Sequence, residues 1–119
     1  MDMLREIFDM QRELDGAIVK GRGLDFSYEE WMQKKCLALI NEAGELMNEV
    51  NYKWWKNKKE LDYSKIGEEL IDILHFLVSM CLDSGLSADD AYRIYAAKNS
   101  ENRDRQEGKS QKDGYKPAR

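Results

Sequence analysis

The chain has 119 residues, of which 42% are hydrophobic and 35% charged, and its formal net charge is −4. A single domain of this length buries only about 60–70% of the surface that its unfolded chain exposes, which favours assembly into an oligomer. The acidic balance argues against a nucleic-acid groove, because surfaces that follow phosphates are basic overall or along one stripe. A smaller anionic ligand is compatible with this charge if cations bridge it.

Two features bear on the compartment. The N-terminal segment mixes acids with apolar residues and lacks the order of a signal peptide, and no apolar run approaches the roughly 18 residues that span a bilayer. Cys36 and Cys81 lie in apolar stretches without CxxC spacing. We therefore expect buried thiols in a reducing compartment and a cytoplasmic protein.

The first half of the chain predicts two helices. Apolar residues at spacings of three, four and seven predict a helix over residues 3–19, which GRGLD ends. A second helix is predicted from Ser27 to about Tyr52, because Ser27 and Glu30 have the Ser-x-x-Glu pattern of a capping box. The expected core face of this second helix comprises Trp31, Leu37, Ile40, Leu46, Met47 and Val50.

Two further helices follow the basic aromatic segment KWWKNKK. The third is predicted to begin near Ser64 or Lys65 and to stop at Gly85, since glycine favours the left-handed conformation that ends helices. Ser87 is the expected N-cap of the fourth helix, which should fray within residues 98–106.

The domain organisation follows from this pattern. Residues 107–119 are polar, rich in Lys and Gly and without apolar periodicity, so on their own they would be disordered. We predict an all-α fold with a helical domain over residues 1–106 and a polar C-terminal tail over residues 107–119.

The most informative feature is the placement of acids on the two central helices. Glu42, Glu45 and Glu49 lie three and four residues apart on one side of the second helix, and Glu69 and Asp72 are three apart on the third. Like charges at these spacings repel. A solvated face with lysines four residues later would relieve this repulsion, but neither Glu42 nor Glu45 has such a lysine. Divalent cations would also relieve it, and we favour a metal site.

These acids stand in motifs that resemble a known family. Glu42-x-x-Glu45 followed by Glu69-x-x-Asp72 resembles the ExxE…ExxD signature of the all-α nucleoside triphosphate pyrophosphatases, the superfamily of MazG-like proteins and dimeric dUTPases. LALINEAGELMNEVNYKWWK, EELIDILHFLVS, YAAKNSENRDRQEGKSQKDGY and MQRELD are similar to further segments of dimeric dUTPases.

The resemblance implies a fold and an activity. The fold would be a bundle of four or five helices whose tail orders over bound nucleotide, and the protein would form a homodimer. The activity would be hydrolysis of dUTP to dUMP and pyrophosphate, with dUDP as a further substrate. Glu42, Glu45, Glu69 and Asp72 would hold about two or three Mg²⁺, or Mn²⁺ in their place, and Glu49 would be a further ligand or would orient the attacking water.

The resemblance also implies substrate contacts. The triphosphate would be bound by Lys53, Lys56, Lys98, Asn99, Asn102, Arg103 and Tyr115. Uracil would stack on Phe76, meet Trp54 and receive a polar contact from Gln11, with Asn48 and His75 nearby. Other interpretations remain open: Phe76 and Trp54 as core aromatics, His75 as a hydrogen-bonded core histidine, and the cations of the last helix as partners of its dipole.

One departure from the family pattern concerns the base. Asp15 stands where many dimeric dUTPases have Asn, which leaves the polar contact to the base open. Two alternative functions are retained. One is a MazG-like pyrophosphatase for another nucleotide, such as dCTP or a damaged nucleotide. The other is a noncatalytic helical dimer that binds or regulates a partner and whose acids only solvate its surface.

Overall fold

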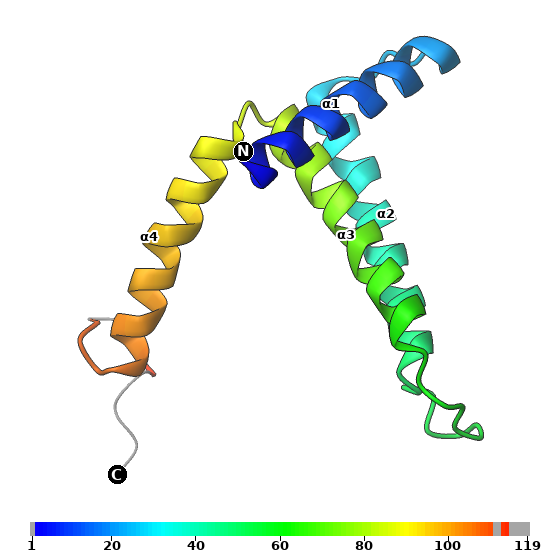
Figure 1. Ribbon diagram of the computed structural model, residues 1–119, viewed down its shortest axis with the longest axis vertical. Coiled ribbons are helices and arrows are strands. Elements are labelled where there is room, and N and C mark those ends of the chain that lie inside the picture. Colours follow the sequence, from blue (N-terminus) through cyan, green and yellow to red (C-terminus); the bar gives the residue numbers. More distant parts are fainter. Residues whose placement is uncertain (1, 111–112, 115–119) are drawn as a thin grey trace. The chain divides into compact units, whose positions relative to one another are not determined.

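The structure is a computed structural model that describes residues 2–110 and 113–114. Within these residues it contains four helices: α1 (Met3–Arg22), α2 (Tyr28–Glu49), α3 (Tyr63–Asp83) and α4 (Ala88–Gln106) (Figure 1). No strand occurs in this part of the chain. The prediction of an all-α fold is confirmed.

Side-chain caps fix where the first two helices begin. Asp2 Oδ1 accepts a hydrogen bond from the Arg5 amide at 3.1 Å, which caps α1. The capping box predicted for α2 is present: the Glu30 amide donates to Ser27 Oγ at 3.2 Å, and the Ser27 amide donates to the Glu30 carboxylate at 3.4 Å. Each cap satisfies an amide that has no partner within its helix.

The second helix ends earlier than predicted, at Glu49 instead of Tyr52. Asn51 has a φ of 61°, a left-handed conformation that Asn tolerates better than most residues. Its side chain forms two hydrogen bonds of 3.0 Å with the backbone of Lys59, donating from Nδ2 to the carbonyl and accepting from the amide. These bonds close the loop between α2 and α3 at its base.

The remaining helices begin and end close to the predicted positions. Asp62 caps α3 by accepting from the Lys65 amide at 3.2 Å, so the helix starts slightly earlier than expected. Gly85 has a φ of 75° just beyond its end. Ser87 caps α4, where its hydroxyl accepts from the Asp90 amide at 3.1 Å. Both serine caps predicted from the sequence are therefore present.

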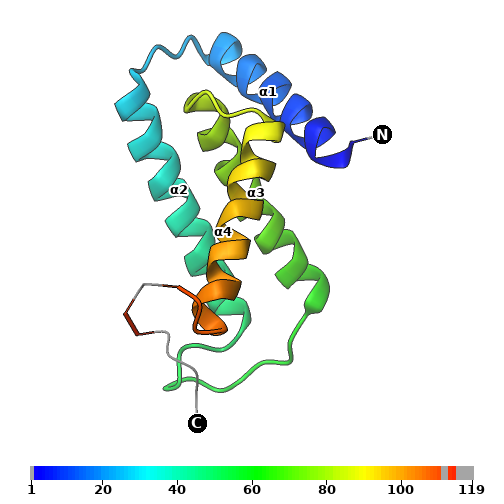
Figure 2. The same cartoon turned by 90° about the vertical axis from the view of Figure 1, so that its left-hand side faces the viewer.

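The chain divides into two compact units, one up to Gly85 and one from Leu86 onward, and each is described by itself. In the first unit α2 lies along α3, and α1 also packs against α3 (Figures 1 and 2). Because α3 contacts both other helices of this unit, side chains from α1, α2 and α3 can meet along it. The prediction of one domain over residues 1–106 stays a prediction.

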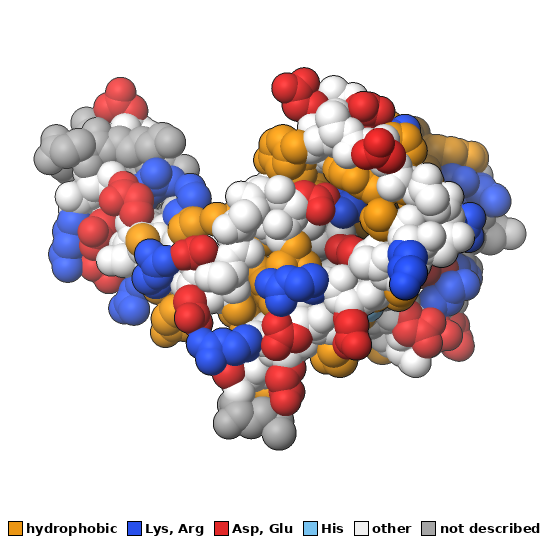
Figure 3. All heavy atoms as spheres, turned by 90° about the horizontal axis from the view of Figure 1, so that it is seen from above, with side chains coloured by type: hydrophobic (Ala, Val, Ile, Leu, Met, Phe, Trp, Pro, Cys, Tyr) orange, Lys and Arg blue, Asp and Glu red, His pale blue; other side chains and the backbone are white. Residues whose placement is uncertain are grey.

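Most of the predicted core face of α2 is exposed, which corrects the sequence interpretation. The relative exposures of Leu37, Ile40, Met47 and Val50 are 67%, 59%, 46% and 46%. Within the first unit α2 packs mainly against α3. A single neighbouring helix covers only one stripe of a helix surface, so the other apolar positions stay open. Figure 3 shows hydrophobic side chains at the surface between charged ones.

The cysteines follow the same pattern. Cys36 on α2 is exposed, so the prediction that both thiols are buried is wrong for this residue, whereas Cys81 on α3 is partly buried. Burial raises the pKa of the Cys81 thiol. Among the described helices, none is by itself both long and apolar enough to cross a membrane.

Candidate active site

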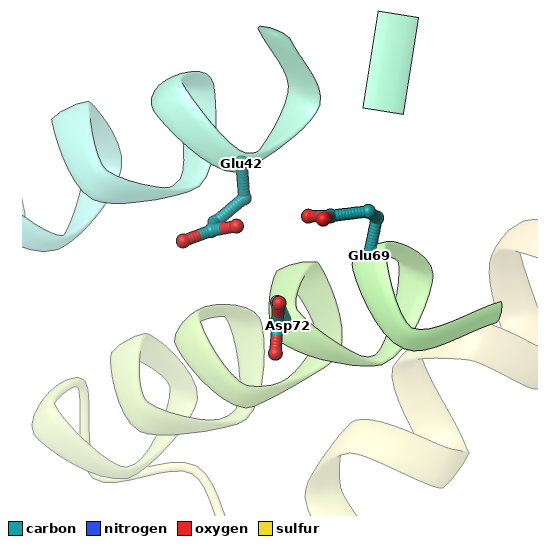
Figure 4. A group of neighbouring side chains, drawn as sticks. All are labelled: Glu42, Glu69 and Asp72. Atoms are coloured by element: carbon teal, nitrogen blue, oxygen red, sulfur yellow. The ribbon is translucent and has the colours of Figure 1, made fainter. Parts of the chain in front are cut away.

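Three carboxylates meet between α2 and α3 (Figure 4). Glu42 comes from α2, while Glu69 and Asp72 come from successive turns of α3, where a spacing of three places them on one side. One carboxylate oxygen from each residue lies within 4.8 Å of those of the other two. We call these three residues the acidic trio.

The surroundings of the two glutamates of the trio disfavour their negative charge. Burial, followed by the charges of Glu45 and Asp72, raises the pKa of Glu42. The pKa of Glu69 is also raised, first by burial and then by the charges of Glu45, Asp72 and Glu42. Oε2 of Glu42 and Oε2 of Glu69 are shielded from solvent and have no hydrogen-bond partner among the residues that the structure describes. A buried acceptor without a hydrogen-bond partner costs free energy on folding, so a ligand that binds these two oxygens would stabilise the protein.

The trio fits a hard divalent cation. Mg²⁺ prefers oxygen ligands and is commonly bound by a few carboxylates together with substrate phosphates. A cation bound by the trio would reduce the repulsion among the three carboxylates and would give the two shielded oxygens a partner. Glu42, Glu69 and Asp72 are therefore the residues best placed to hold Mg²⁺.

The other two predicted acids on α2 lie outside the trio. Glu45 is exposed, but its charge raises the pKa of both glutamates of the trio, so it lies close enough to act on them. Glu49 is 7% exposed and forms ion pairs with Lys59 Nζ at 3.1 Å and Lys65 Nζ at 3.6 Å. A role for Glu49 as a ligand or as the group that orients water stays a prediction.

The raised pKa values predict how the stability of the metal-free protein depends on pH. A group whose pKa is raised on folding contributes stability that is full below the unfolded value of 4.5 and is lost as pH rises through the folded pKa. We therefore expect Glu69→Gln to raise the melting temperature by a few degrees at neutral pH in EDTA. The difference from the unmodified protein should shrink as the pH is lowered from about 7.5 to 5.

Glu68→Gln is the control for this prediction, because Glu68 is an exposed acid on the same helix. It should leave both the melting temperature and its pH dependence nearly unchanged. A Glu69→Gln protein that melts with the unmodified one at every pH would show that the trio is not electrostatically strained.

A pocket of about 550 Å³ adjoins the trio, and Glu42 and Asp72 form part of its lining. Its volume falls in the range of small-molecule sites, which is roughly 300–1,000 Å³. Trp31 and Phe76 contribute aromatic surface. Trp31 is itself held in place by the edge-on ring of Phe26 at 5.0 Å. The pocket therefore offers aromatic faces beside a group of cation-binding carboxylates.

Polar side chains from α1 and α3 form a connected wall in this pocket. Gln11 Nε2 donates to Asp15 Oδ1 at 2.9 Å, and Ser79 Oγ donates to Asp15 Oδ2 at 2.6 Å. Gln11 Oε1 lies 2.6 Å from His75 Nδ1. Gln11 and Ser79 are 7% and 2% exposed, so both are held firmly. The structure thus brings the predicted Gln11, His75 and Phe76 into one pocket.

The loop after α2 holds several of the predicted phosphate contacts. Lys53 and Lys56 line a second, polar pocket of about 250 Å³, to which Asn48 contributes from the end of α2, away from the pocket that holds Phe76. Trp54 lies in the same loop, is 85% exposed and packs edge-on against Trp55 with centroids 4.6 Å apart. Trp54 does not line the larger pocket, so the structure does not bring it together with Phe76.

The predicted contacts on α4 belong to the second unit. Asn99 and Arg103 line a hollow of about 300 Å³ on that helix, and Lys98 is exposed. Asn102 Oδ1 accepts a hydrogen bond from Arg105 Nη1 at 3.2 Å. Tyr115 lies outside the described residues. The roles of these residues toward substrate stay predictions.

Sequence reasoning did not predict several lining residues of the larger pocket, and Trp31 and Ser79 are two of them. Trp31 continues an apolar stripe of the second helix, a pattern that predicts a core position. Ser79 follows His75 by four residues on α3, just as Asp15 follows Gln11 by four on α1. Each of these two apolar helices therefore carries two polar residues four positions apart, on one side of the helix. That shared spacing is the sequence signal that the two polar pairs lie against each other.

The site thus combines carboxylates suited to cations with an adjoining pocket that has aromatic walls, in a part of the chain that is built from helices. A comparison with protein families identifies the family to which the chain belongs. Residues 3–90 match the family described as dUTPase, and the chain belongs to this family of all-helical, dimeric dUTPases. No curated protein and no solved structure matches the chain significantly.

The matched region carries most of the candidate site. It includes the trio, the whole lining of the larger pocket and the lysine loop. It ends within the first turn of α4, before Lys98. The resemblance of the closing segment therefore rests on the sequence motif alone.

Proposed function

We propose that this protein is a Mg²⁺-dependent pyrophosphohydrolase that converts dUTP to dUMP and pyrophosphate and also accepts dUDP. The observation that carries the proposal is the acidic trio, two of whose members, Glu42 and Asp72, also line the adjoining pocket of about 550 Å³. The family supports hydrolysis of dUTP as the first activity to test.

The arrangement of the pocket and the trio favours one orientation of a bound nucleotide. Phe76 contributes an aromatic ring for stacking of a base, Lys35 Nζ lies over the ring of Trp31 at 4.7 Å, and Glu42 and Asp72 belong both to the lining and to the trio. A nucleoside in the pocket would therefore present its phosphates to the trio. Bound Mg²⁺ would neutralise phosphate charge and favour deprotonation of a water for attack on phosphorus.

The protein side chains would supply the remaining neutralisation. A triphosphate carries about four negative charges, which a site lined with acids repels unless cations accompany it. Lys53 and Lys56 line the polar pocket in the loop and are proposed to bind the phosphates distal to the nucleoside. Lys98, Asn99, Asn102, Arg103 and Tyr115 remain proposed triphosphate contacts from the C-terminal part.

We also propose a homodimer. The side chains of Leu37 and Ile40 on α2, and of Leu70 and Leu77 on α3, are about half exposed or more. Apolar rows of this kind are uncommon on monomers and are typical of interfaces. Sedimentation equilibrium of the full chain tests the proposal, and a monomer at micromolar concentration would contradict it.

The experiment that tests the proposed activity is pyrophosphate release from a panel of canonical nucleotides and deoxynucleotides, with Mg²⁺ and again with EDTA. We expect release from dUTP that depends on Mg²⁺. Release without Mg²⁺ would contradict the role of the trio. Silence across the panel, with the protein folded, would favour the noncatalytic helical dimer.

A further inference from the structure

The polar wall of the larger pocket contains a carboxylate, Asp15, whose hydrogen-bond partners hold it in the pocket lining. Both of its oxygens are engaged, Oδ1 by Gln11 and Oδ2 by Ser79. Asp15 is only partly buried, whereas these two partners are almost completely buried. The partners therefore fix the carboxylate in place in the lining of the pocket, and each oxygen retains a lone pair for a further donor.

The direction of every bond in this wall is determined. A carboxylate only accepts hydrogen bonds, so Gln11 must direct its NH₂ group, and Ser79 its hydroxyl hydrogen, to Asp15. The amide oxygen of Gln11 then faces His75, whose Nδ1 must carry the proton and donate. His75 thus donates to Gln11, and Gln11 and Ser79 both donate to Asp15. What these residues leave for a ligand is mainly acceptors on Asp15, next to the second N–H of Gln11.

This pattern matters for the 4-position of a pyrimidine. Cytosine carries an amino group there, which donates, beside N3, which accepts. Uracil carries a carbonyl oxygen at the same position, which accepts, beside N3–H. The 4-amino group is a suitable partner for a carboxylate, and N3 of cytosine is a suitable acceptor for the Gln11 N–H. The 4-carbonyl of uracil would instead face the lone pairs of Asp15.

We infer that Asp15 is a specificity-determining residue that lets this pocket bind cytosine nucleotides, with dCTP as a substrate, by accepting a hydrogen bond from the 4-amino group of the base. This inference rests on the proposed function, because it concerns the base that enters the same site. An amide at position 15 would present an N–H toward the pocket and would reverse the preference toward the 4-carbonyl of uracil.

The test compares dCTP and dUTP with the unmodified protein, with Asp15→Asn and with Glu13→Gln. Glu13 is an exposed acid on α1 outside the pocket, so its variant controls for loss of one negative charge on that helix. The ratio of kcat/KM for dCTP to that for dUTP should fall by about tenfold or more in Asp15→Asn. Glu13→Gln should leave the ratio unchanged.

Two measurements separate failure of this inference from failure of the proposed function. Calorimetric titration with α,β-imido-dCTP and α,β-imido-dUTP reports base preference without turnover. Binding of the dCTP analogue that Asp15→Asn weakens, in a protein with no hydrolysis, would sustain the inference and refute the proposed activity. An unmodified protein that hydrolyses dUTP but neither binds nor hydrolyses the cytosine nucleotide would overturn the inference alone. A loss confined to dUTP in Asp15→Asn would overturn it as well, because Asp15 would then face N3–H of uracil.

Discussion

Asp72→Asn is expected to lower kcat for dUTP hydrolysis by about 100-fold or more, the scale on which loss of one charge-stabilising group acts. Asp72 belongs to the acidic trio and also lines the nucleoside pocket, so it lies where cation and substrate would meet. Asn keeps the size of the side chain but removes the charge. Steady-state pyrophosphate release at saturating Mg²⁺ measures the effect.

Helical content must be checked alongside this measurement by far-ultraviolet circular dichroism, which should be unchanged because Asp72 is exposed and its removal relieves repulsion. Glu68→Gln, on the same helix, should retain nearly full activity. Full activity of Asp72→Asn would remove this residue, and with it the trio, from the reaction. Activity regained only at much higher Mg²⁺ would instead support weakened cation binding.

Phe76→Ala is expected to raise KM for the preferred nucleotide by about tenfold, because stacking of a base on an aromatic side chain contributes roughly 1–3 kcal/mol. Phe76 lines the pocket from α3. Because its ring carries no charge and transfers no proton, we expect kcat to change much less than KM. Initial rates over a range of nucleotide concentrations separate the two parameters.

Two further variants make this prediction specific. Tyr63→Ala removes an exposed aromatic side chain of the same helix that lies outside the pocket, and it should leave KM unchanged. Trp54→Ala tests the other aromatic predicted to meet uracil. If Trp54→Ala raises KM while Phe76→Ala does not, the base binds elsewhere than in the larger pocket.

Helix positions could be predicted well because their signals are local. Ser27 and Ser87 each lie at the start of an apolar or acidic helical pattern with an acid three residues later, and both form capping boxes. The end of α2 could not be predicted in this way. Val50 and Tyr52 continue the apolar pattern, and it is the pairing of Asn51 with Lys59, eight residues later, that turns the chain.

The candidate site was predictable only in part. Regular spacing identified Glu42, Glu69 and Asp72, because helical periodicity places them on facing sides of α2 and α3. Periodicity cannot show that Glu49, one turn beyond Glu45, pairs with Lys59 and Lys65 instead. Those lysines belong to the loop and to the next helix, so the pairing depends on how the chain folds back.

The loop between α2 and α3 is closed at its base by its own hydrogen bonds, so its length is independent of the packing of the two helices. Asn51 and Lys59 bind each other through two hydrogen bonds, so the intervening segment is a ring whose ends are fixed to one another and not only to the two helices. Closing a chain costs little more free energy as it lengthens, since the cost grows only with the logarithm of its length. Insertions within residues 52–58 should therefore leave the packing of α2 on α3 intact, which makes this ring the natural place to attach a probe or to exchange a binding segment.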